Sequence, residues 1–309
     1  MIVYSLPLRN TFRGITVREG MLFEGPAGWA EWCPFWEYDD RTCVAWWRAA
    51  REAAYDGWPA PVRSSVPVNC TVPAVGPGRA ATIVTASGCA TAKVKVAEPG
   101  QALADDVARV EAVRSALGPG GRIRVDANGA WDVSGAVRAL RELARFGLEY
   151  AEQPCATVEE LALVRRRVDV PVAADESIRR ASDPYRVREL DAADIAVLKV
   201  QPLGGVWACL EIAERIGLPV VVSSALETSV GMAAGVALAA ALPELPYACG
   251  LATVSMFEHD VAATPLLPVD GALPVVRVDP DPDLLAAAAA DEGTTAAWRA
   301  RLDRVRRLG

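Results

Sequence analysis

Short runs of β-branched and aliphatic residues recur along most of the chain, and a longer stretch rich in Ala, Leu and Arg follows each of them. The runs start about twenty to thirty residues apart, a spacing typical of repeated βα units that build a parallel sheet. Eight strands are predicted: Val68–Val72, Ala92–Val96, Ile123–Asp126, Glu149–Glu152, Val172–Asp175, Ile195–Lys199, Val220–Ser224 and Tyr247–Gly250. Eight such units favour a barrel, although no repeat is strong enough to exclude an open doubly wound sheet.

The two ends of the chain have a different pattern. Before residue 66, a strand-like segment, Thr16–Phe23, is followed by a Gly/Pro-rich turn and by a helix-like segment from about Arg41 to Tyr55. The apolar and aromatic residues of that helix share one face, so a small α+β unit is predicted. At the other end, the Arg-rich stretch Arg299–Arg307 is predicted to be a solvated amphipathic helix.

Composition narrows the classes of function. A net charge of −7 and a pI near 5.0 argue against a nucleic-acid binder. The apolar stretch Val230–Leu242 is too short for a membrane span and predicts a packed helix, and Met1–Leu8 lacks the pattern of a secretory signal. Seven cysteines without a CxxC pair fit a reducing cytoplasm and offer no zinc cluster. The single histidine, His259, argues against a Ser-His hydrolase and is expected to be structural.

Lysine is rare in this chain: Lys93, Lys95 and Lys199 stand against twenty-nine arginines. Arginine keeps its proton, whereas a lysine ammonium can be driven towards neutrality by burial or by nearby positive charge and then act as a base. Lys93 and Lys95 project from the same face of one predicted strand, and Lys199 ends another. An Arg-rich composition could leave three lysines by chance, but their place on strands favours one site.

Three acidic residues close three successive predicted strands: Asp126, Glu152 and Asp175. In a barrel, the carboxyl ends of the strands converge on the face that holds the active site. Three convergent carboxylates would repel one another without a cation, and their oxygen atoms suit Mg²⁺. Each acid taken alone could instead cap a helix or form a structural ion pair.

The motifs Lys93-x-Lys95, Asp126-Ala-Asn128, Glu152-Gln-Pro154, Ala174-Asp-Glu-Ser177 and Leu198-Lys199 together resemble the muconate-lactonising branch of the enolase superfamily. This resemblance implies a modified (β/α)7β TIM-type barrel with an N-terminal α+β capping domain. The implied parts are a cap over residues 1–65, a barrel over 66–255 and a C-terminal segment, 256–309, that completes the barrel or the cap. It also implies Mg²⁺, or Mn²⁺ in its place, on the three strand-end acids, and lysines that face each other across the substrate.

Within this branch, the segments Phe12–Gly20, Ser223–Gly231 and Gly250–Thr253 are similar to those of the actinobacterial o-succinylbenzoate synthases of menaquinone biosynthesis. The similarity implies a cytoplasmic, Mg²⁺-dependent lyase that acts on a small carboxylate substrate. Its reaction would be the syn dehydration of 2-succinyl-6-hydroxy-2,4-cyclohexadiene-1-carboxylate to o-succinylbenzoate. Related enzymes racemise N-acylamino acids or epimerise dipeptides, so a racemase is the alternative. A non-catalytic Mg²⁺-binding scaffold is a remote one, and the sequence leaves the oligomeric state open.

Roles for the lysines follow from the chemistry of such a dehydration. Lys95 is the candidate base, because Lys93, Lys199 and a metal ion would all disfavour its charged form. The same Lys95, once protonated, could donate to the leaving hydroxide. Lys199 would stabilise the enediolate from the other side of the substrate, whereas in a racemase it would be the second acid/base.

Secondary candidates lie beside these residues. Arg124 shares a strand face with Asp126 and could bind a carboxylate, orient Lys93 or pair with a metal ligand. Asn128 and Glu176 follow their strands closely and could orient ligands or lysines.

Two further segments are candidates for contact with the substrate. Ser223 and Ser224 could receive its second carboxylate, or could cap a helix. Residues Thr11–Gly20 could close over the site, with Gly14 and Gly20 allowing movement, or could form an ordinary hairpin.

Overall fold

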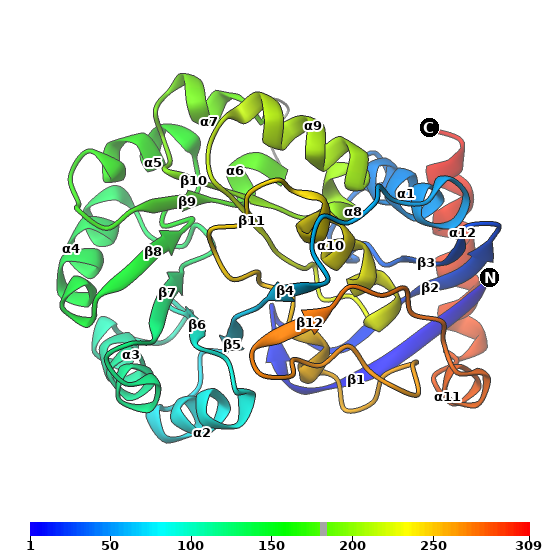
Figure 1. Cartoon of the computed structure of the whole chain (residues 1–309), viewed down its shortest axis with the longest axis horizontal. Helices are drawn as coiled ribbons and strands as arrows, with labels where there is room; N and C mark the ends of the chain where they lie inside the picture. Colours follow the sequence, from blue (N-terminus) through cyan, green and yellow to red (C-terminus); the bar gives the residue numbers. More distant parts are fainter. Residues whose placement is uncertain (180–183) are drawn as a thin grey trace.

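The computed structural model of the protein describes residues 1–179 and 184–309. A curved parallel sheet with helices outside it makes up the larger part, and an antiparallel sheet lies beside it together with both chain termini (Figure 1). The larger part comes from the middle of the chain, and the smaller part from its beginning and its end. A parallel sheet with an N-terminal α+β part beside it is therefore present, as predicted.

Seven parallel strands form the curved sheet, and each hydrogen-bonds to the next in chain order. Valine, isoleucine and alanine dominate them, as expected for strands that are covered on both faces. Each overlaps a predicted strand, with ends that differ by one or two residues. They are β5 (Cys70–Val72), β6 (Thr91–Lys95), β7 (Arg122–Asp126), β8 (Leu148–Glu152), β9 (Val172–Ala174), β10 (Ile195–Leu198) and β11 (Val220–Val222).

The eighth predicted strand, Tyr247–Gly250, is reduced to one bridging residue on each side. Cys249 exchanges main-chain hydrogen bonds of 2.7 and 2.9 Å with the segment that precedes β5. The Gly250 N–H donates to the Val222 carbonyl of β11 at 2.8 Å, and the Gly250 carbonyl accepts from the Ser224 N–H at 3.1 Å. These bonds connect the two edges of the sheet, so the fold is the predicted (β/α)7β TIM-type barrel with a short closing segment.

Helices cover the outside of the barrel. Their bounds are α2 (Pro77–Ser87), α3 (Leu103–Leu117), α4 (Val133–Leu143), α5 (Val158–Arg165), α6 (Glu176–Arg179), α7 (Arg186–Glu189), α8 (Val200–Leu203), α9 (Val206–Ile216) and α10 (Ser229–Ala241), with 3-10 turns at Ala144–Phe146 and Thr253–Met256. The side chain of Asp132 caps α4, and Thr157 forms a capping box at α5.

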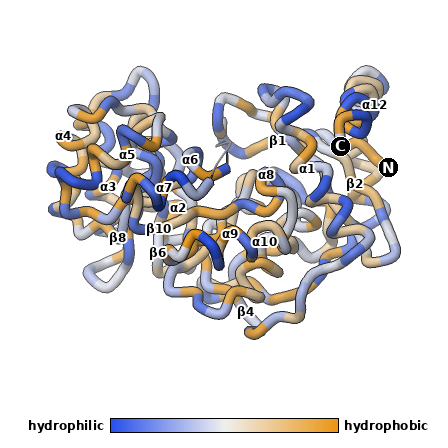
Figure 2. The backbone as a smooth tube through the Cα atoms, turned by 90° about the horizontal axis from the view of Figure 1, so that it is seen from above, coloured by the Kyte–Doolittle hydropathy of each residue, from blue (hydrophilic) through white to orange (hydrophobic). Residues whose placement is uncertain are grey.

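Helix α10 differs from the other helices because it is apolar all round and almost wholly buried. It lies between the barrel and the antiparallel sheet, and Figure 2 shows it in the middle of the molecule. This confirms the prediction of a packed helix at Val230–Leu242. In the described ranges, no helix is long and apolar enough to cross a membrane.

The cap is an antiparallel sheet of β1 (Ile2–Phe12), β2 (Ile15–Gly25) and β3 (Gly28–Trp32), with α1 (Thr42–Arg51) and a π-helical turn (Glu52–Asp56) packed on it. The predicted strand and helix of this region are present, whereas β1 was not predicted. A two-stranded ribbon, β4 (Ser65–Pro67) with β12 (Ala272–Pro274), follows where the cap leads into the barrel. The chain ends in α11 (Pro282–Ala287) and α12 (Glu292–Arg306).

Helix α12 corrects the prediction that the Arg-rich C-terminal stretch is solvated. Trp298, Leu302 and Val305 are buried in the core of the cap. Arg301 is also buried, and its guanidinium donates hydrogen bonds to the main-chain carbonyls of Pro34, Phe35 and Tyr38. Charge counting along the sequence missed this because a guanidinium can be buried when carbonyl oxygens accept hydrogen bonds from its N–H groups.

Replacing Trp298 with Ala should strongly destabilise the cap. The indole is fully buried, meets the Trp32 ring edge-on at 5.4 Å between centroids and donates to Glu19 at 3.0 Å. Loss of such a side chain costs about 3–5 kcal/mol. Urea denaturation would measure the free energy of unfolding. Trp207→Ala is the control, since Trp207 is 53% exposed and its loss should change stability by less than about 0.5 kcal/mol; equal effects would contradict the assignment of α12 to the core.

Candidate active site

Three carboxylates meet at the C-terminal end of the barrel because three neighbouring strands end there together. Asp126 is the last residue of β7, Glu152 is the last of β8, and Asp175 follows β9 directly. Asp126 and Glu152 are register partners on adjacent strands. All three side chains are 1% exposed, so their charges depend on partners within the protein.

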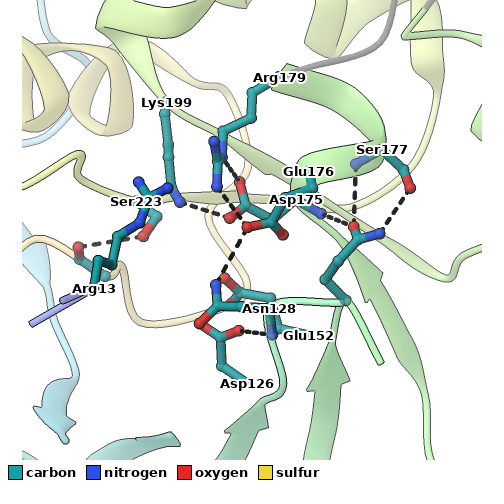
Figure 3. Close-up of polar contacts among 12 residues, drawn as sticks. Arg13, Asp126, Asn128, Glu152, Asp175, Glu176, Ser177, Arg179, Lys199 and Ser223 are labelled. Carbon is teal, nitrogen blue, oxygen red and sulfur yellow. Dashed lines mark hydrogen bonds and ion pairs between the residues drawn. The ribbon is translucent and has the colours of Figure 1, made fainter. Parts of the chain in front are cut away.

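Each of these carboxylates has a lysine partner. The Lys93 ammonium lies 3.0 Å from a Glu152 oxygen and 3.4 Å from Asp126. The Lys95 ammonium lies 2.5 Å from Asp126. Lys199, which directly follows β10, lies 2.6 Å from Asp175. The three lysines therefore belong to one polar cluster, part of which is drawn in Figure 3.

Arg179 also belongs to this cluster, and the sequence analysis missed it. Its guanidinium donates to Asp175 at 2.8 Å, to Glu176 at 2.5 Å and to the Tyr38 hydroxyl of the cap at 3.0 Å. Among twenty-nine arginines, one more attracts no notice. The available signal was its position four residues after Asp175, because residues four apart share a helical face.

Gln153 holds the turn that carries Asp175. Its side-chain oxygen accepts from the main-chain N–H groups of Asp175 at 3.0 Å and Ser177 at 3.1 Å, and its amide donates to the Cys155 carbonyl. Gln153 and Asn128 both adopt left-handed backbone angles, with φ of +40° and +46°. Asn adopts this conformation readily, whereas for Gln153 it is unfavourable and the surrounding hydrogen bonds hold it in place.

Burial and mutual repulsion act against the acidic charges. Burial raises the pKa of Glu152 to about 7, and the neighbouring Asp126 adds to the rise. Burial alone would raise the pKa of Asp126 as well, but Lys95 and Lys93 hold it well below the usual range of an aspartate. Asp126 is thus ionised, and Glu152 is the acid whose charge is least compensated.

The basic groups respond in opposite directions. Burial would lower the pKa of the Lys93 ammonium, but Glu152 and Asp126 outweigh burial and raise it. Burial lowers the pKa of Lys199, although Asp175 opposes the shift. Lys93 is therefore held in its charged form by the two acids, whereas burial disfavours the charged form of Lys199.

The donor set suits a divalent cation. Lys93 places one positive charge between Asp126 and Glu152, at 3.4 and 3.0 Å from their oxygens. In the described part of the chain, no three acidic, His or Cys side chains form a ready group of ligands. The carboxylates turn to the lysines and to Arg179 instead. By chemistry, three buried oxygen ligands match Mg²⁺, so the residues fit this ion.

Asn128 and Glu176 make hydrogen bonds within the cluster. Asn128 accepts from the Lys95 ammonium at 2.6 Å and donates to Glu176 at 3.2 Å. Its main-chain N–H also donates to Asp126 at 3.0 Å. Glu176 receives the bond from Arg179 described above, so Asn128 and Glu176 link the two ends of the cluster (Figure 3).

Arg124 corrects the prediction made for it. It is fully buried and pairs with Glu149 at 2.6 Å, with Asn69 and with the Ala248 carbonyl. Its guanidinium lies 4.7 Å from the centre of the Tyr150 ring. It does not line the active-site cavity and is not paired with a strand-end acid, because a shared strand face does not fix the depth of a side chain in the barrel.

Ser223 and Ser224 line the cavity, as do the three lysines. The Ser224 hydroxyl hydrogen-bonds to that of Thr253 at 2.7 Å, and the Ser223 hydroxyl lies 3.5 Å from the Gly250 carbonyl. Neither serine caps α10, whose N-cap residue is Thr228.

The cap supplies the outer wall of the cavity. Phe12 ends β1 and Arg13 follows it in the turn to β2; both line the cavity, and the Arg13 guanidinium pairs with Glu37 at 2.7 Å. The rest of Thr11–Gly20 is hairpin, and a side chain at Gly20 would come within 2.6 Å of Cys33 and Tyr4, so Gly20 is a packed position and no hinge.

Other parts of the cap supply three more aromatic walls, Phe35, Tyr38 and Trp46. The barrel side adds Thr71, Asn128, Pro202, Ala225, Leu226, Gly250 and Thr253. His259 is exposed and lies outside this lining.

Sequence comparisons place the chain among known proteins. Residues 3–54 match the model of the enolase N-terminal domain-like family, and residues 78–281 match that of the enolase C-terminal domain-like family. An o-succinylbenzoate synthase of Thermobifida fusca is 69% identical over 97% of this chain and 93% of its own length. One from Mycolicibacterium smegmatis is 57% identical over 98% of this chain and 93% of its own length.

Solved structures agree on the fold. The muconate cycloisomerase of Pseudomonas fluorescens has a TM-score of 0.78 at 21% identity, covering 94% of this chain and 97% of its own. The N-succinyl Arg/Lys racemase of Bacillus cereus has a TM-score of 0.77 at the same identity and the same coverage. These findings confirm the resemblance drawn from the strand-end motifs, and the chain belongs to the enolase superfamily.

Proposed function

We propose that this chain is an o-succinylbenzoate synthase, a lyase that converts 2-succinyl-6-hydroxy-2,4-cyclohexadiene-1-carboxylate to o-succinylbenzoate in menaquinone biosynthesis. The observation that carries the proposal is the 69% identity, over 97% of the chain, to a synthase of that name. The cluster of lysines and carboxylates at the barrel end supplies the groups that such a dehydration needs.

Asp126, Glu152 and Asp175 would hold Mg²⁺, or Mn²⁺ in its place. When bound, the ion supplies positive charge to the substrate carboxylate next to the carbon that loses its proton. Lys93 is the structural complement of this set, because its raised pKa keeps it charged against Glu152 and Asp126. We assign it to charge balance among the ligands.

Lys95 is the proposed base. Its amine removes the proton beside the substrate carboxylate, and the resulting ammonium donates a proton to the hydroxyl group that leaves as water from the same face. Hydrogen bonds to Asp126 and Asn128 fix the position of this nitrogen. The C–H and C–O bonds break, one ring double bond forms, and the lysine returns to its starting state.

Lys199 lies in the same cavity and approaches from β10, four strands away from Lys95 on β6. Its ammonium would stabilise the negative charge that develops on the substrate, and it could also lie against the new aromatic ring. Ser223 and Ser224 remain candidates for binding the second carboxylate through hydroxyl or main-chain donors.

A racemase of N-acylamino acids is the second candidate. The observation that favours it is the lowered pKa of Lys199, which suits a group that must lose and regain a proton. With Lys95 and Lys199 on different strands of one cavity, a proton could leave on one side and return on the other.

The cellular location and the division into domains are also part of the proposal. A cytoplasmic location is supported by the seven cysteines, all buried free thiols. The division into a cap (1–65), a barrel (66–255) and a completing segment (256–309) is supported by the packing of α12 on the cap.

Lys95→Arg should abolish synthase activity while the fold survives. The variant keeps the positive charge but cannot release its proton at neutral pH, so kcat should fall by about 10²–10⁴-fold or more. Steady-state turnover of the cyclohexadiene substrate would measure this, with circular dichroism and affinity for o-succinylbenzoate as controls. Near-normal turnover would remove Lys95 from the role of base.

Asp126→Asn, Glu152→Gln and Asp175→Asn should each weaken Mg²⁺ binding by roughly tenfold or more, because an amide oxygen carries no charge. Isothermal titration with Mg²⁺ measures this without turnover. Glu149→Gln is the matched control, since Glu149 is a buried carboxylate at the other end of β8 that pairs with Arg124. Unchanged affinity in all three ligand variants would refute the metal site.

Lys199→Ala separates the two candidate reactions. If Lys199 acts by charge alone, the variant should slow solvent deuterium exchange into both enantiomers of an N-succinylamino acid to a similar degree. NMR would follow the loss of the α-proton signal for each enantiomer. A loss confined to one enantiomer would make Lys199 an acid/base and move the function to the racemase.

A further inference from the structure

The segment between β11 and α10 forms a wall of the active-site cavity through Ser224, Ala225 and Leu226. Leu226 has a φ of +65°, a left-handed backbone that a branched, bulky residue adopts only at a cost in energy. Neither neighbour is a glycine that could relieve the turn. Something outside the segment must therefore hold it in this conformation.

Arg18 of the cap supplies that restraint. Its Nε donates to the Leu226 carbonyl at 2.9 Å, and its Nη2 donates to the Ala225 carbonyl at 3.2 Å and to that of Cys33. The residue is 2% exposed, and its guanidinium lies 4.1 Å from the centre of the Phe35 ring. Since Phe35 also lines the cavity, Arg18 contacts two of its walls without lining the cavity itself.

Two buried carboxylates complete the restraint. Glu31 of β3 accepts from the main-chain N–H groups of Thr228 at 3.1 Å and Gly231 at 3.0 Å, and from the Tyr4 hydroxyl at 2.6 Å. Glu227 folds back and accepts from the Ala225 N–H at 2.8 Å. Donors and acceptors along this stretch of the wall are thus bound by buried charged side chains.

These buried charged groups leave the turn at Leu226 little room to move. Burying a guanidinium and two carboxylates is unfavourable unless each is hydrogen-bonded and its charge is compensated. At Gly231 a Cβ atom would lie 2.7 Å from a Glu31 oxygen and 2.9 Å from the Glu227 Cβ, so the packing is close. If the cap and the barrel needed only to adhere, apolar contacts would do so without this cost.

We propose that Arg18 is a positioning residue: it fixes the left-handed turn at Leu226 and thereby shapes the cavity wall that selects the substrate. Arg18 acts through Ala225, Leu226 and Phe35 and contacts no reacting atom. The selectivity that we assign to this wall rests on the proposed synthase function: the wall then favours the compact cyclohexadiene ring over an open acylamino chain. The restraint of the Leu226 turn by Arg18 does not depend on that function.

The structural part is tested by hydrogen–deuterium exchange of the peptide that covers residues 224–231, with no ligand present. In Arg18→Met we expect its amides to exchange at least about tenfold faster than in the wild type, because local opening becomes easier. Arg18→Lys keeps the charge but loses the planar fork, so it should show a smaller change in the same direction and serves if Arg18→Met does not fold.

Arg114→Met is the matched control. Arg114 also donates to four main-chain carbonyls, those of Phe146, Gly118, Gly121 and Gly147, but it lies on α3, away from the cavity lining. Its loss should affect stability without changing exchange in 224–231. If the Arg18 variants leave exchange there as slow as in Arg114→Met, the positioning role is overturned.

The functional part is a split between KM and kcat. Arg18→Met should raise KM for the cyclohexadiene substrate by about tenfold and change kcat by less than about threefold, because Lys95 and the metal ligands stay in place. The ratio of kcat/KM for this substrate to that for an N-succinylamino acid should fall. Equal losses for both substrates, or a loss confined to kcat, would overturn the selectivity claim.

A double variant tests the link through Leu226. Glycine adopts a positive φ at no steric cost, so Leu226→Gly removes the backbone penalty that Arg18 offsets. Arg18→Met should then raise KM by a smaller factor in the Leu226→Gly background than in the wild type, and additive effects would contradict the proposed route. If the wild type turns over neither substrate, the proposed function fails, while the exchange experiment still decides the role of Arg18.

Discussion

The need to balance three buried carboxylates governs the design of this protein. Asp126, Glu152 and Asp175 are removed from water at the ends of adjacent strands, where their mutual repulsion is strong. Four basic side chains from neighbouring strands and a helix compensate these charges: Lys93, Lys95, Lys199 and Arg179. This charge pattern suits a hard cation and an anionic substrate, which is what the proposed function requires.

The supporting residues follow from the same constraint. A buried charge in the wrong position by even a small distance loses its partners, so the turns after the strands must be rigid. Gln153 fixes the turn that carries Asp175, and Asn128 holds Lys95 and Glu176 together. Both residues adopt left-handed backbones at strand ends, where the hydrogen bonds they make outweigh the local cost.

The cap is built into the site and does more than cover it. Its aromatic residues and Arg13 line the cavity, Tyr38 bonds to Arg179, and Arg18 and Glu31 hold the segment after β11. Helix α12 in turn packs behind the cap sheet, and its Arg301 binds the carbonyls around Phe35. Residues from the beginning and middle of the chain thus line one cavity, and residues near its end support the cap wall.

The sequence by itself determined the barrel and the main members of its site. The short β-branched runs placed acids and lysines at strand ends, and parallel strands bring such residues together whatever the details of packing. Tertiary structure decided what depends on depth and on contacts between distant segments. Arg124 and Asp126 share a strand face, yet Arg124 pairs with Glu149 below the cavity. Arg18 and Arg301 are buried because main-chain carbonyl oxygens of distant segments accept hydrogen bonds from their guanidinium groups. Local patterns carry no record of those partners, because the partners lie tens to hundreds of residues away along the chain.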